Sequence, residues 1–363
     1  MITKEIISFL DLSTWKEAEV HQNVTKLTVS YTMDEASQIT VQILDPGFEM
    51  LTNNYFQIRR LIQYRGRLFE IAALEVGTAD GATPMVTVEA RSGPIQLMKR
   101  DKVPESFRGI SATEFAQTIA SRYNLKFFGE QTPKKQSIVK SRSSNADESV
   151  WDVLTRAASD AQFVCFESDG TLFFCSQRFL LGRISSGNTS GLTGIYGPEY
   201  PGEPIKKNST GNVVGLIQGI VGVLVDEVYG VATEAAVKAF QTANGLSATG
   251  IVEVNTWNKM FRSIQAKQTY TPMRWPTPST ERNFIVMQQP SVRRSDDDPF
   301  EGDGSLSVDR VNGVKLRAGQ TIGLIGIPQF EGLYLITETR FDEASPDPVE
   351  ISFRTPATPE KPR

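Results

Sequence analysis

The stretch ADESVWDVLTRAASDAQFVCFESDGTLFF, residues 146–174, places a helix directly before a hairpin and decides the fold class of the middle of the chain. We expect the helix to start near Asn145, with Glu148 three residues on, as in a capping box. Phe-rich strands then flank Asp169-Gly170, a favoured two-residue hairpin turn. The apolar residues of the helix recur at helical spacing: Val150, Trp151, Leu154, Ala158 and Ala161.

The hairpin also holds both cysteines of the chain, Cys165 and Cys175. With Asp169-Gly170 as the turn, Cys165 lies opposite Phe174 and Cys175 lies opposite Val164. Opposed residues share a face of a sheet and alternate residues do not, so the two thiols point to opposite faces. We therefore expect two buried, reduced cysteines and no disulfide.

A second helix precedes this stretch. Ser111 and Glu114 have the spacing of a capping box, and Phe115, Ile119 and Tyr123 follow on adjoining helical positions. Two helices and a hairpin predict a small α+β domain over residues 101–182.

Strand patterns lie before this domain, in residues 1–100. Apolar and polar residues alternate strictly in VTKLTVSYT and in SQITVQILDPG, which is typical of half-buried antiparallel strands. Strands at such short spacing predict a small β-barrel or β-sandwich. By alternation, Gln38, Thr40 and Gln42 lie opposite the apolar face, and they are candidates for a polar lining.

Strand patterns return in residues 284–356, which predict a second β-domain. Asn312-Gly313 is a strong short-range hairpin signal, and GLYLITETRF and PVEISFRTP supply further strands. Residues 357–363 are expected to be a frayed tail.

Two segments of linker composition enclose an inserted domain over residues 211–264. Residues 183–210 are rich in Gly, Ser, Thr and Pro, and residues 265–283 form a Pro-rich, stiffer linker. Three short helices are predicted between them.

Local signals mark the three helices. The first is expected to bury Val214, Ile217, Val221 and Leu224, and its spaced glycines leave a membrane-active peptide as an alternative. Thr233 and Asn255 are expected to cap the second and third helices. A Glu234–Lys238 pair supports the second helix, which ends at Asn244-Gly245.

Composition excludes several classes of function. The formal net charge of −4, with acidic and basic residues mixed, argues against a nucleic-acid binder. No signal peptide is evident, and the longest apolar run, residues 213–225, is too short to span a bilayer. We expect a soluble intracellular chain without stable membrane insertion.

Catalytic and metal sites are not expected. His21 is the only histidine of the chain and is interpreted as a surface or strand-edge residue. Zinc peptidases, Cys–His amidases and Ser–His–Asp hydrolases all need a histidine beside a catalytic or metal-binding partner, so these classes of enzyme are not expected. The acidic stretch 295–304 lacks the ligand spacing of an EF-hand and is predicted to be a solvated loop. No cofactor is predicted.

A set of turn, cap and core positions occurs in the inserted segment: Asp226, Tyr229, Gly230, Thr233, Val237, Phe240, Gln241, Gly245, Leu246, Gly250, Val252, Thr256 and Trp257. With these residues the segment resembles a peptidoglycan-binding domain of the three-helix type. Glu227, Thr249 and Glu253 depart from the family pattern in the two turns beside the family's glycan groove. Trp257 and Phe240 are interpreted as core residues as well. The resemblance implies these candidate glycan contacts, with Tyr229 and Asp226 as the better surface candidates: Asp226, Tyr229, Thr233, Thr256 and Trp257.

The rest of the chain resembles the late-control-D-like tail hub proteins of tailed phages and contractile injection systems. ATEFAQTIASRYNLKF, the opening stretch 146–174 and the C-terminal strands carry the likeness, with Gln162 where glycine is usual. The resemblance implies a non-enzymatic homotrimer whose six barrels adapt a hexameric tail tube to a threefold spike. Its implied partners are the tube protein above, the spike or tail-tip protein below and other baseplate proteins, with DNA only in transit through the lumen.

The sequence thus predicts an α+β multidomain protein with two tube-like antiparallel barrels, a small α+β domain and an inserted three-helix bundle. Its expected location is the virion tail or baseplate, after assembly in the host cytoplasm, and its module recognises host peptidoglycan in this hypothesis. The alternatives are a peptidoglycan-binding cell-wall hydrolase and a glycan-binding adhesin.

Overall fold

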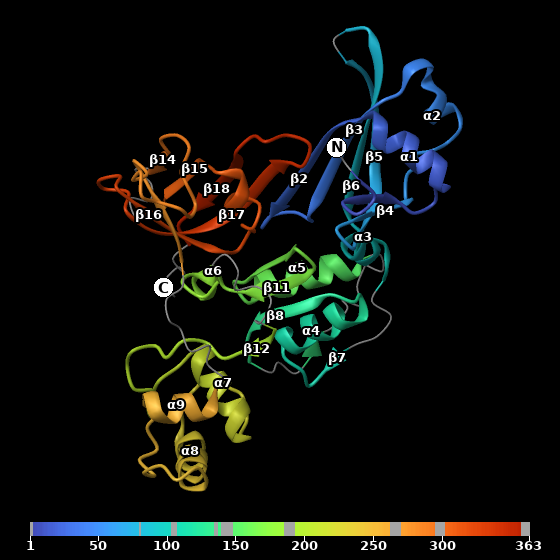
Figure 1. Ribbon diagram of the computed structural model, residues 1–363. Coiled ribbons are helices and arrows are strands. Elements are labelled where there is room, and N and C mark those ends of the chain that lie inside the picture. The colour runs from blue at the N-terminus through green and yellow to red at the C-terminus, as the bar shows by residue number, and fades with distance from the viewer. Residues whose placement is uncertain are drawn as a thin grey trace.

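The computed structural model describes residues 3–79, 81–102, 107–133, 137–138, 148–184, 193–261, 270–294 and 302–356. A large sheet is built from both ends of the chain, an α+β unit lies beneath it, and a helical module lies at the far end (Figure 1). The predicted helix start at Asn145, most of the acidic loop (295–301) and the tail 357–363 lie outside the described residues.

The N-terminal half-sheet is all antiparallel, and its strand order is β1-β4-β5-β6-β3-β2. Four short helical segments accompany it: α1 (Thr14–Asn23), η1 (Pro46–Phe48), α2 (Glu49–Thr52) and α3 (Gly93–Arg100). Its strands are β1 (Ile7–Phe9), β2 (Val24–Thr32), β3 (Gln38–Leu44), β4 (Leu61–Tyr64), β5 (Arg67–Ala79) and β6 (Thr83–Ser92).

The C-terminal half-sheet follows the same path. The strands β14-β15-β18-β17-β16-β13 correspond in order to β2-β3-β6-β5-β4-β1, and only the β13–β16 pair is parallel. Its elements are β13 (Thr271–Arg274), β14 (Ser291–Arg294), β15 (Gly302–Val308), α10 (Arg310–Gly313), β16 (Thr321–Ile325), β17 (Gly332–Asp342) and β18 (Val349–Arg354).

The two half-sheets join through β2 and β17 into one 12-stranded sheet. No closed barrel is found among the residues that the structure describes, so the expectation of two separate barrels is replaced by one continuous sheet of two like halves. The reason is that β17 extends beyond β16 and offers its second part, Glu338–Asp342, to β2. Sequence patterns show alternation within a strand but not which distant strand it pairs with.

The α+β unit has a mixed four-stranded sheet, in which β8 pairs in parallel with β11 and β12. Helices α4 (Ala112–Arg122) and α5 (Val150–Asp160) pack through buried Phe115, Ile119 and Leu154, and α6 (Gln177–Leu180) follows the sheet. The strands are β7 (Phe107–Arg108), β8 (Lys126–Glu130), β9 (Ser137–Ile138), β10 (Val164–Ser168), β11 (Thr171–Cys175) and β12 (Gly194–Tyr196).

Two local predictions for this unit are confirmed and one is wrong. The Ser111–Glu114 capping box is present. Cys165 pairs with Phe174 and Cys175 with Val164, and both thiols are free, although only Cys175 is buried as expected and Cys165 is partly buried. The cap of α5 is Ser149 with Asp152, because the Ser149 hydroxyl accepts from the Asp152 amide, so Glu148 lies outside the capping box.

The helical module contains α7 (Asn212–Val221), α8 (Val231–Ala243) and α9 (Val254–Met260) around a core of its own. The first helix is shorter than expected, because Gly222 at φ 77° ends it and leaves Leu224 73% exposed. The Glu234–Lys238 pair is present at 2.6 Å, and α8 ends at Asn244 as expected. No helix in the described part of the chain is long and apolar enough to cross a membrane.

The segments of linker composition are structured where they are described. Residues 194–196 form β12 of the α+β sheet, and residues 271–274 form β13 of the large sheet. Beyond β12, the indole Nε1 of Trp257 donates to the carbonyl of Pro198 at 3.1 Å. Ile205 forms a β-bridge with Val252. The module is therefore held by direct contacts to residues 197–211, the segment that connects β12 to α7.

The expected hairpin at Asn312-Gly313 is also corrected. These residues belong to the short helix α10, because the Asp309 carboxylate caps it by accepting from the Asn312 amide at 3.1 Å. The helix cap at Asp309 therefore determines the local structure, although Asn312-Gly313 is a strong hairpin signal.

Candidate functional site

A polar face runs across the junction of the two half-sheets. Side chains alternate along β2, β3 and β17, so that Val29, Ile39 and Phe341 are buried on one face while hydroxyls, amides and charges line the other. A hollow of about 360 Å³ lies on this polar face. It is lined by Thr28, Ser30, Thr32, Asp34, Glu35, Ala36, Gln38, Thr40, Glu338 and Arg340.

The hollow surface continues over the C-terminal half-sheet. A second hollow of about 470 Å³ shares Glu338 and Arg340 with the first and extends over β14, β15 and β18. A third of about 480 Å³ shares Ser291, Ser305 and Ser352 with the second. The three hollows therefore make one polar groove that crosses the junction.

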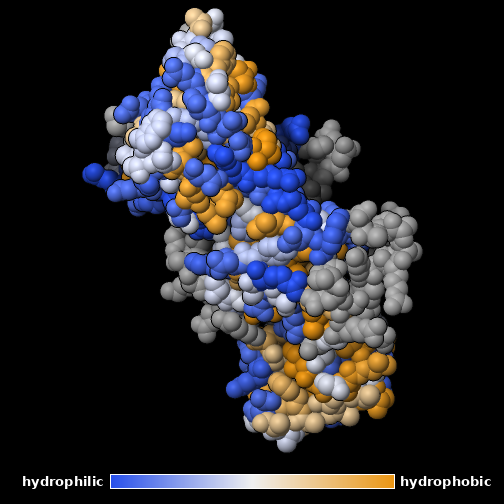
Figure 2. All heavy atoms as spheres, turned by 90° about the vertical axis from the view of Figure 1, so that its right-hand side faces the viewer, coloured by the Kyte–Doolittle hydropathy of each residue, from blue (hydrophilic) through white to orange (hydrophobic). Residues whose placement is uncertain are grey.

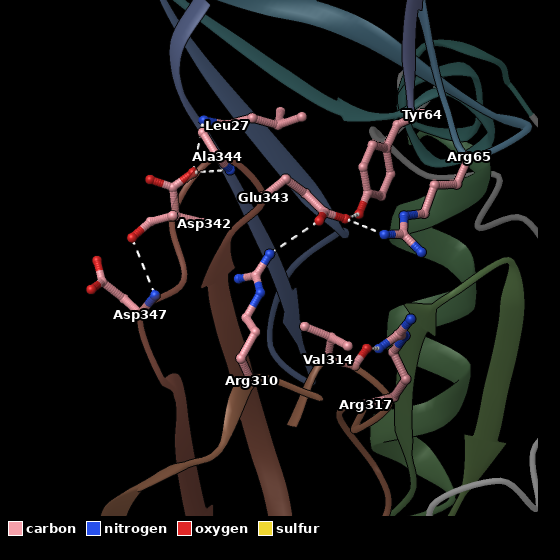
Figure 3. A network of polar contacts seen from close by, with 11 residues as sticks. Leu27, Tyr64, Arg65, Arg310, Val314, Arg317, Asp342, Glu343, Ala344 and Asp347 are labelled. Carbon is pink, nitrogen blue, oxygen red and sulfur yellow. Dashed lines mark hydrogen bonds and ion pairs between the residues drawn. The ribbon is translucent and has the colours of Figure 1, made fainter. Parts of the chain in front are cut away.

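Glu343 fastens the two half-sheets together (Figure 3). Its carboxylate lies 2.7 Å from the Arg65 guanidinium and 3.1 Å from that of Arg310, and it accepts from the Tyr64 hydroxyl at 2.5 Å. The side chain is only 6% exposed, so these ionic contacts are poorly screened by water. Desolvation raises the pKa of Tyr64, and the neighbouring carboxylate adds to this shift.

A second polar cluster joins both half-sheets to the α+β unit. Asp169, in the β10–β11 turn, lies 3.1 Å from Arg67 of β5 and 3.6 Å from Arg317, which follows α10. The Arg317 guanidinium lies 4.3 Å from the centre of the Tyr31 ring. Burial raises the pKa of Tyr31 to about 12, which keeps this phenol neutral. The three parts of the chain therefore meet at one charged turn.

In the helical module, a buried glutamine organises the first turn. The Gln218 amide nitrogen donates to the Asp226 carboxylate at 2.7 Å, to the Val228 carbonyl at 3.0 Å and to the Thr233 hydroxyl at 3.0 Å. Its carbonyl oxygen accepts from the Asp226 and Glu227 amides. The side chain is 1% exposed, so its hydrogen bonds are made almost entirely within the protein.

The same arrangement returns 23 residues later. The Gln241 amide nitrogen donates to the Thr249 hydroxyl, the Ile251 carbonyl and the Thr256 hydroxyl, and its oxygen accepts from the Gly250 amide. Each partner follows its counterpart in the first turn by 23 residues. The module thus contains two copies of one helix–turn unit: α7 with the turn that follows it (212–230), and α8 with the turn that follows it (231–253). The Tyr229 hydroxyl connects the two units by donating to the Gly250 carbonyl at 2.9 Å.

The structure divides the predicted glycan contacts into two groups. Asp226 is exposed, and hydrogen bonds from the Gln218 side chain and the Val228 amide lower its pKa. Trp257 is 1% exposed, as its core interpretation predicts, whereas Phe240 is only partly buried. Thr233 and Thr256 are also buried, at 2% and 4% exposure.

Three sequence expectations for the module are therefore corrected. Tyr229 is not a surface residue, because it is fully buried between the two helix–turn units. Thr233 does not cap α8, whose cap position is Gly230, because its hydroxyl accepts from Gln218 instead. Asn255 lies inside α9, which follows Glu253.

The module surface is apolar around its first turn. Figure 2 shows apolar and weakly apolar residues over much of the module at the bottom of the view, below mostly hydrophilic parts. Leu224, Val228 and Val231 are 73%, 48% and 68% exposed, close in sequence to the Asp226 carboxylate. A solvent-facing apolar turn beside one carboxylate is suited to binding a ligand with both apolar and hydrogen-bonding groups.

No group of three or more metal-ligating side chains occurs in the described ranges. His21 belongs to the last turn of helix α1 and is partly buried, so its interpretation as a surface or strand-edge residue is corrected. Its Nε2 lies 2.9 Å from the carbonyl of Ile7 in β1.

Fold and module together describe an α+β protein with a duplicated β-sheet and an embedded helical domain. Residues 216–260 match the family model described as a putative peptidoglycan binding domain. Over most of its length, the chain is also similar to tail proteins of known structure.

Three of these solved structures illustrate the likeness. The tail protein from Neisseria meningitidis MC58 is 10% identical, with a TM-score of 0.46 over 92% of each chain. The 43 kDa tail protein of prophage MuSo2 from Shewanella oneidensis is 9% identical, with a TM-score of 0.44 over 92% of this chain and 93% of that one. Prophage tail protein gp18 from Listeria monocytogenes EGD-e is 10% identical, with a TM-score of 0.41 over 90% and 87%. A search of curated protein sequences found no match.

Sequence reasoning missed the residues that join the parts. Glu343 and Arg317 lie in loops that carry no sequence signal, and the predicted turn at Asp169 gives no indication of its contacts with Arg67 and Arg317. Gln218 and Gln241 could have been found from the 23-residue spacing that also relates Thr233 to Thr256.

Proposed function

We propose that the chain is a structural hub of a phage tail or a related contractile injection system, and that it works as a homotrimer. In this proposal each half-sheet is a tube-like β-domain, and three chains supply six such domains to match a hexameric tail tube above and a threefold spike below. A duplicated domain allows one gene product to meet both symmetries. The role is structural rather than enzymatic, and its location is the tail or baseplate of the virion.

One observation carries this proposal: two half-sheets of the same strand order join edge to edge, and one polar groove crosses the join. In a closed ring, neighbouring domains of the same strand order must join edge to edge, as these two half-sheets do. The resemblance of the α4–β11 region and the C-terminal strands to tail hub proteins supports the same function.

The polar groove is proposed as this chain's share of the lumen. Gln38 and Thr40 line its first hollow together with serine and threonine hydroxyls. The charged residues of this hollow are Asp34, Glu35, Glu338 and Arg340, three acidic and one basic. A face without clustered basic residues favours passage of DNA over its retention, because tight DNA binding needs such clusters.

The module is proposed to recognise host peptidoglycan, which rests on the family match over residues 216–260. Asp226 is the proposed direct contact, beside the exposed apolar side chains of the first turn. Tyr229, Thr233, Thr256 and Trp257 contribute by holding the turns in place, since all four are buried. N-acetyl and peptide methyl groups of peptidoglycan match an apolar surface with a nearby carboxylate.

Native mass spectrometry of the purified chain, alone and with its tail tube protein, tests the hub proposal. Three copies are expected. A chain that stays monomeric at all concentrations, with and without tube protein, would overturn the proposal.

Co-sedimentation with purified peptidoglycan sacculi tests the module. We expect Val231→Asp to reduce the sedimented fraction, because it places a charge on the exposed apolar turn. Val254→Asp is the matched control, since Val254 is the first residue of α9 after the second turn, as Val231 is the first residue of α8 after the first turn. Equal binding by both variants and the wild-type chain would count against the assigned surface.

A further inference from the structure

The N-terminal half-sheet has an unused strand edge where the C-terminal half-sheet makes the intrachain junction. β17 pairs first with β16, through Leu333–Leu335, and then with β2, through Glu338–Asp342. β5 pairs with β4 through Arg67–Glu70, and with β6 along its opposite edge. Its second part, Ala73–Ala79, has no partner strand on the β4 edge among the described residues.

β5 and β17 correspond residue by residue. Each has a register shift against its hairpin partner, between Ile71 and Ala73 in β5 and between Ile336 and Glu338 in β17. The backbone of Ile71 exchanges hydrogen bonds with Arg59 and Arg60, and the backbone of Ile336 does so with Gly319 and Gln320. The bulges thus align Ile71 with Ile336, and Val76 with Phe341.

β14 is the counterpart of β2. Each is the outer strand of a hairpin, with β15 and with β3. Val292 lies opposite Gly304 as Val29 lies opposite Ile39, and each inner strand pairs onward with β18 or β6. β2 is covered on its outer side by β17, whereas β14 pairs only with β15 among the described residues. Within the described ranges, β5 and β14 therefore each keep an unpaired edge, and these edges lie at opposite ends of the large sheet (Figure 1).

We propose that the free part of β5 in one copy pairs with β14 of a second copy, in the register of the intrachain β17–β2 junction. Within the chain, Arg340 lies opposite Ser30 and Phe341 lies opposite Val29. The corresponding pairs between copies are Glu75 with Arg293, and Val76 with Val292. Leu74 then lies opposite Arg294, and Gly77 lies opposite Ser291.

The residues at these positions suit this pairing. Glu75 and Arg293 carry opposite charges and are both exposed, with Arg293 80% exposed. Arg293 lies 3.5 Å from Asp303 of its own chain, and because this pair is exposed and weak, Arg293 can share its charge with Glu75 on the polar face. Val76 is 53% exposed, although the equivalent Phe341 is only 4% exposed in the junction. Pairing with Val292 would bury Val76 as Val29 buries Phe341. A partner strand would also satisfy the open backbone groups of both edges.

Head-to-tail pairing of this kind continues the polar groove from one copy to the next. The groove already includes Arg293 and Ser291 of β14, and Glu75 corresponds to the groove residue Arg340. The inference rests on the proposed hub assembly and specifies which strands form its interface between chains.

Charge reversal and crosslinking of the full chain test the pairing. We expect Glu75→Arg or Arg293→Glu to raise the concentration for half-assembly by about tenfold, because each places like charges opposite one another. The double variant E75R/R293E should restore assembly, as measured by analytical ultracentrifugation. An effect of the single variants without restoration in the double variant would overturn the assigned register.

Crosslinking provides the second readout. Glu75→Cys with Arg293→Cys should give chains linked to one another on mild oxidation, whereas Glu75→Cys with Val254→Cys should not. The native Cys175 is buried and Cys165 is partly buried, which limits background linkage. Trimers that neither crosslink through 75 and 293 nor respond to charge reversal would overturn this interface and leave the hub proposal standing. A chain that never assembles, even with tube protein, would overturn both.

Discussion

Replacing Gln241 by leucine should destabilise the helical module strongly, because this one side chain satisfies four polar groups. Leucine keeps most of the volume but leaves the buried Gly250 amide without its acceptor, and it leaves the partly buried Ile251 carbonyl with only a 3.4 Å contact from the Thr249 hydroxyl. Each buried group left unsatisfied costs about 1–3 kcal/mol. A module of this size has an expected total stability of only about 3–8 kcal/mol, so a loss of about 3–5 kcal/mol leaves it marginal.

Hydrogen exchange of the full chain, followed by mass spectrometry, measures this loss where it occurs. A loss of about 3 kcal/mol corresponds to a decrease of more than about 100-fold in amide protection across α7, α8 and α9. Amides of the α+β unit should keep their protection. Gln218→Leu should give a similar result, because Gln218 organises the equivalent turn.

The matched control is Thr242→Ala, which follows Gln241 directly and removes only an exposed hydroxyl that donates to the Lys238 carbonyl. It should change the stability by less than about 0.5 kcal/mol. If Gln241→Leu leaves protection within about threefold of wild type, the reasoning from buried amide satisfaction is refuted.

Three further predictions follow from the junction and the first turn. Glu343→Gln should lower the free energy of unfolding by about 1–3 kcal/mol, because Arg65 and Arg310 lose their shared anion; urea denaturation measures this against Glu350→Gln as the exposed control, and equal midpoints would contradict it. Glu227→Gly should stabilise the module by up to about 1 kcal/mol, because Glu227 adopts φ 60° where the equivalent Gly250 adopts φ 71°; thermal unfolding followed at the module is the test, and a lower Tm would oppose the strain argument. The module should lose stability as pH falls below about 4, because folding lowers the pKa of Asp226 from its usual 3.8. The stabilisation by the Asp226 carboxylate is present above that value and is lost when the carboxylate is protonated. Hydrogen exchange at pH 3 and pH 7, corrected for intrinsic rates, should show a smaller pH dependence in Asp226→Asn than in the wild-type chain.

Local structure was predictable from the sequence wherever the interacting residues lie a few positions apart in the chain. The Ser111 capping box, the Asp169-Gly170 turn and the opposite faces of Cys165 and Cys175 each depend on residues a few positions apart. Alternation likewise predicted which residues of β2 and β3 face the core. These features are set by side-chain period and turn chemistry.

Contacts between distant residues were not predictable in the same way. The pairing of β2 with β17 joins residues about 310 positions apart, and Glu343 reaches Tyr64 across 279 positions. The family resemblance made Tyr229 a candidate surface residue, but it is buried between two helix–turn units. That burial depends on the packing of the second unit, whose relation to the first is visible only at a spacing of 23 residues.

We propose that three copies of this chain form a ring of six half-sheets around a polar lumen. Electron cryomicroscopy of the chain assembled with its tail tube protein would show this ring. We expect a threefold ring at the end of the tube, with Gln38, Thr40 and Arg340 facing the lumen and the helical modules away from it. A monomer at the tube end, a ring with another number of copies, or half-sheets with their polar faces turned outward would contradict it.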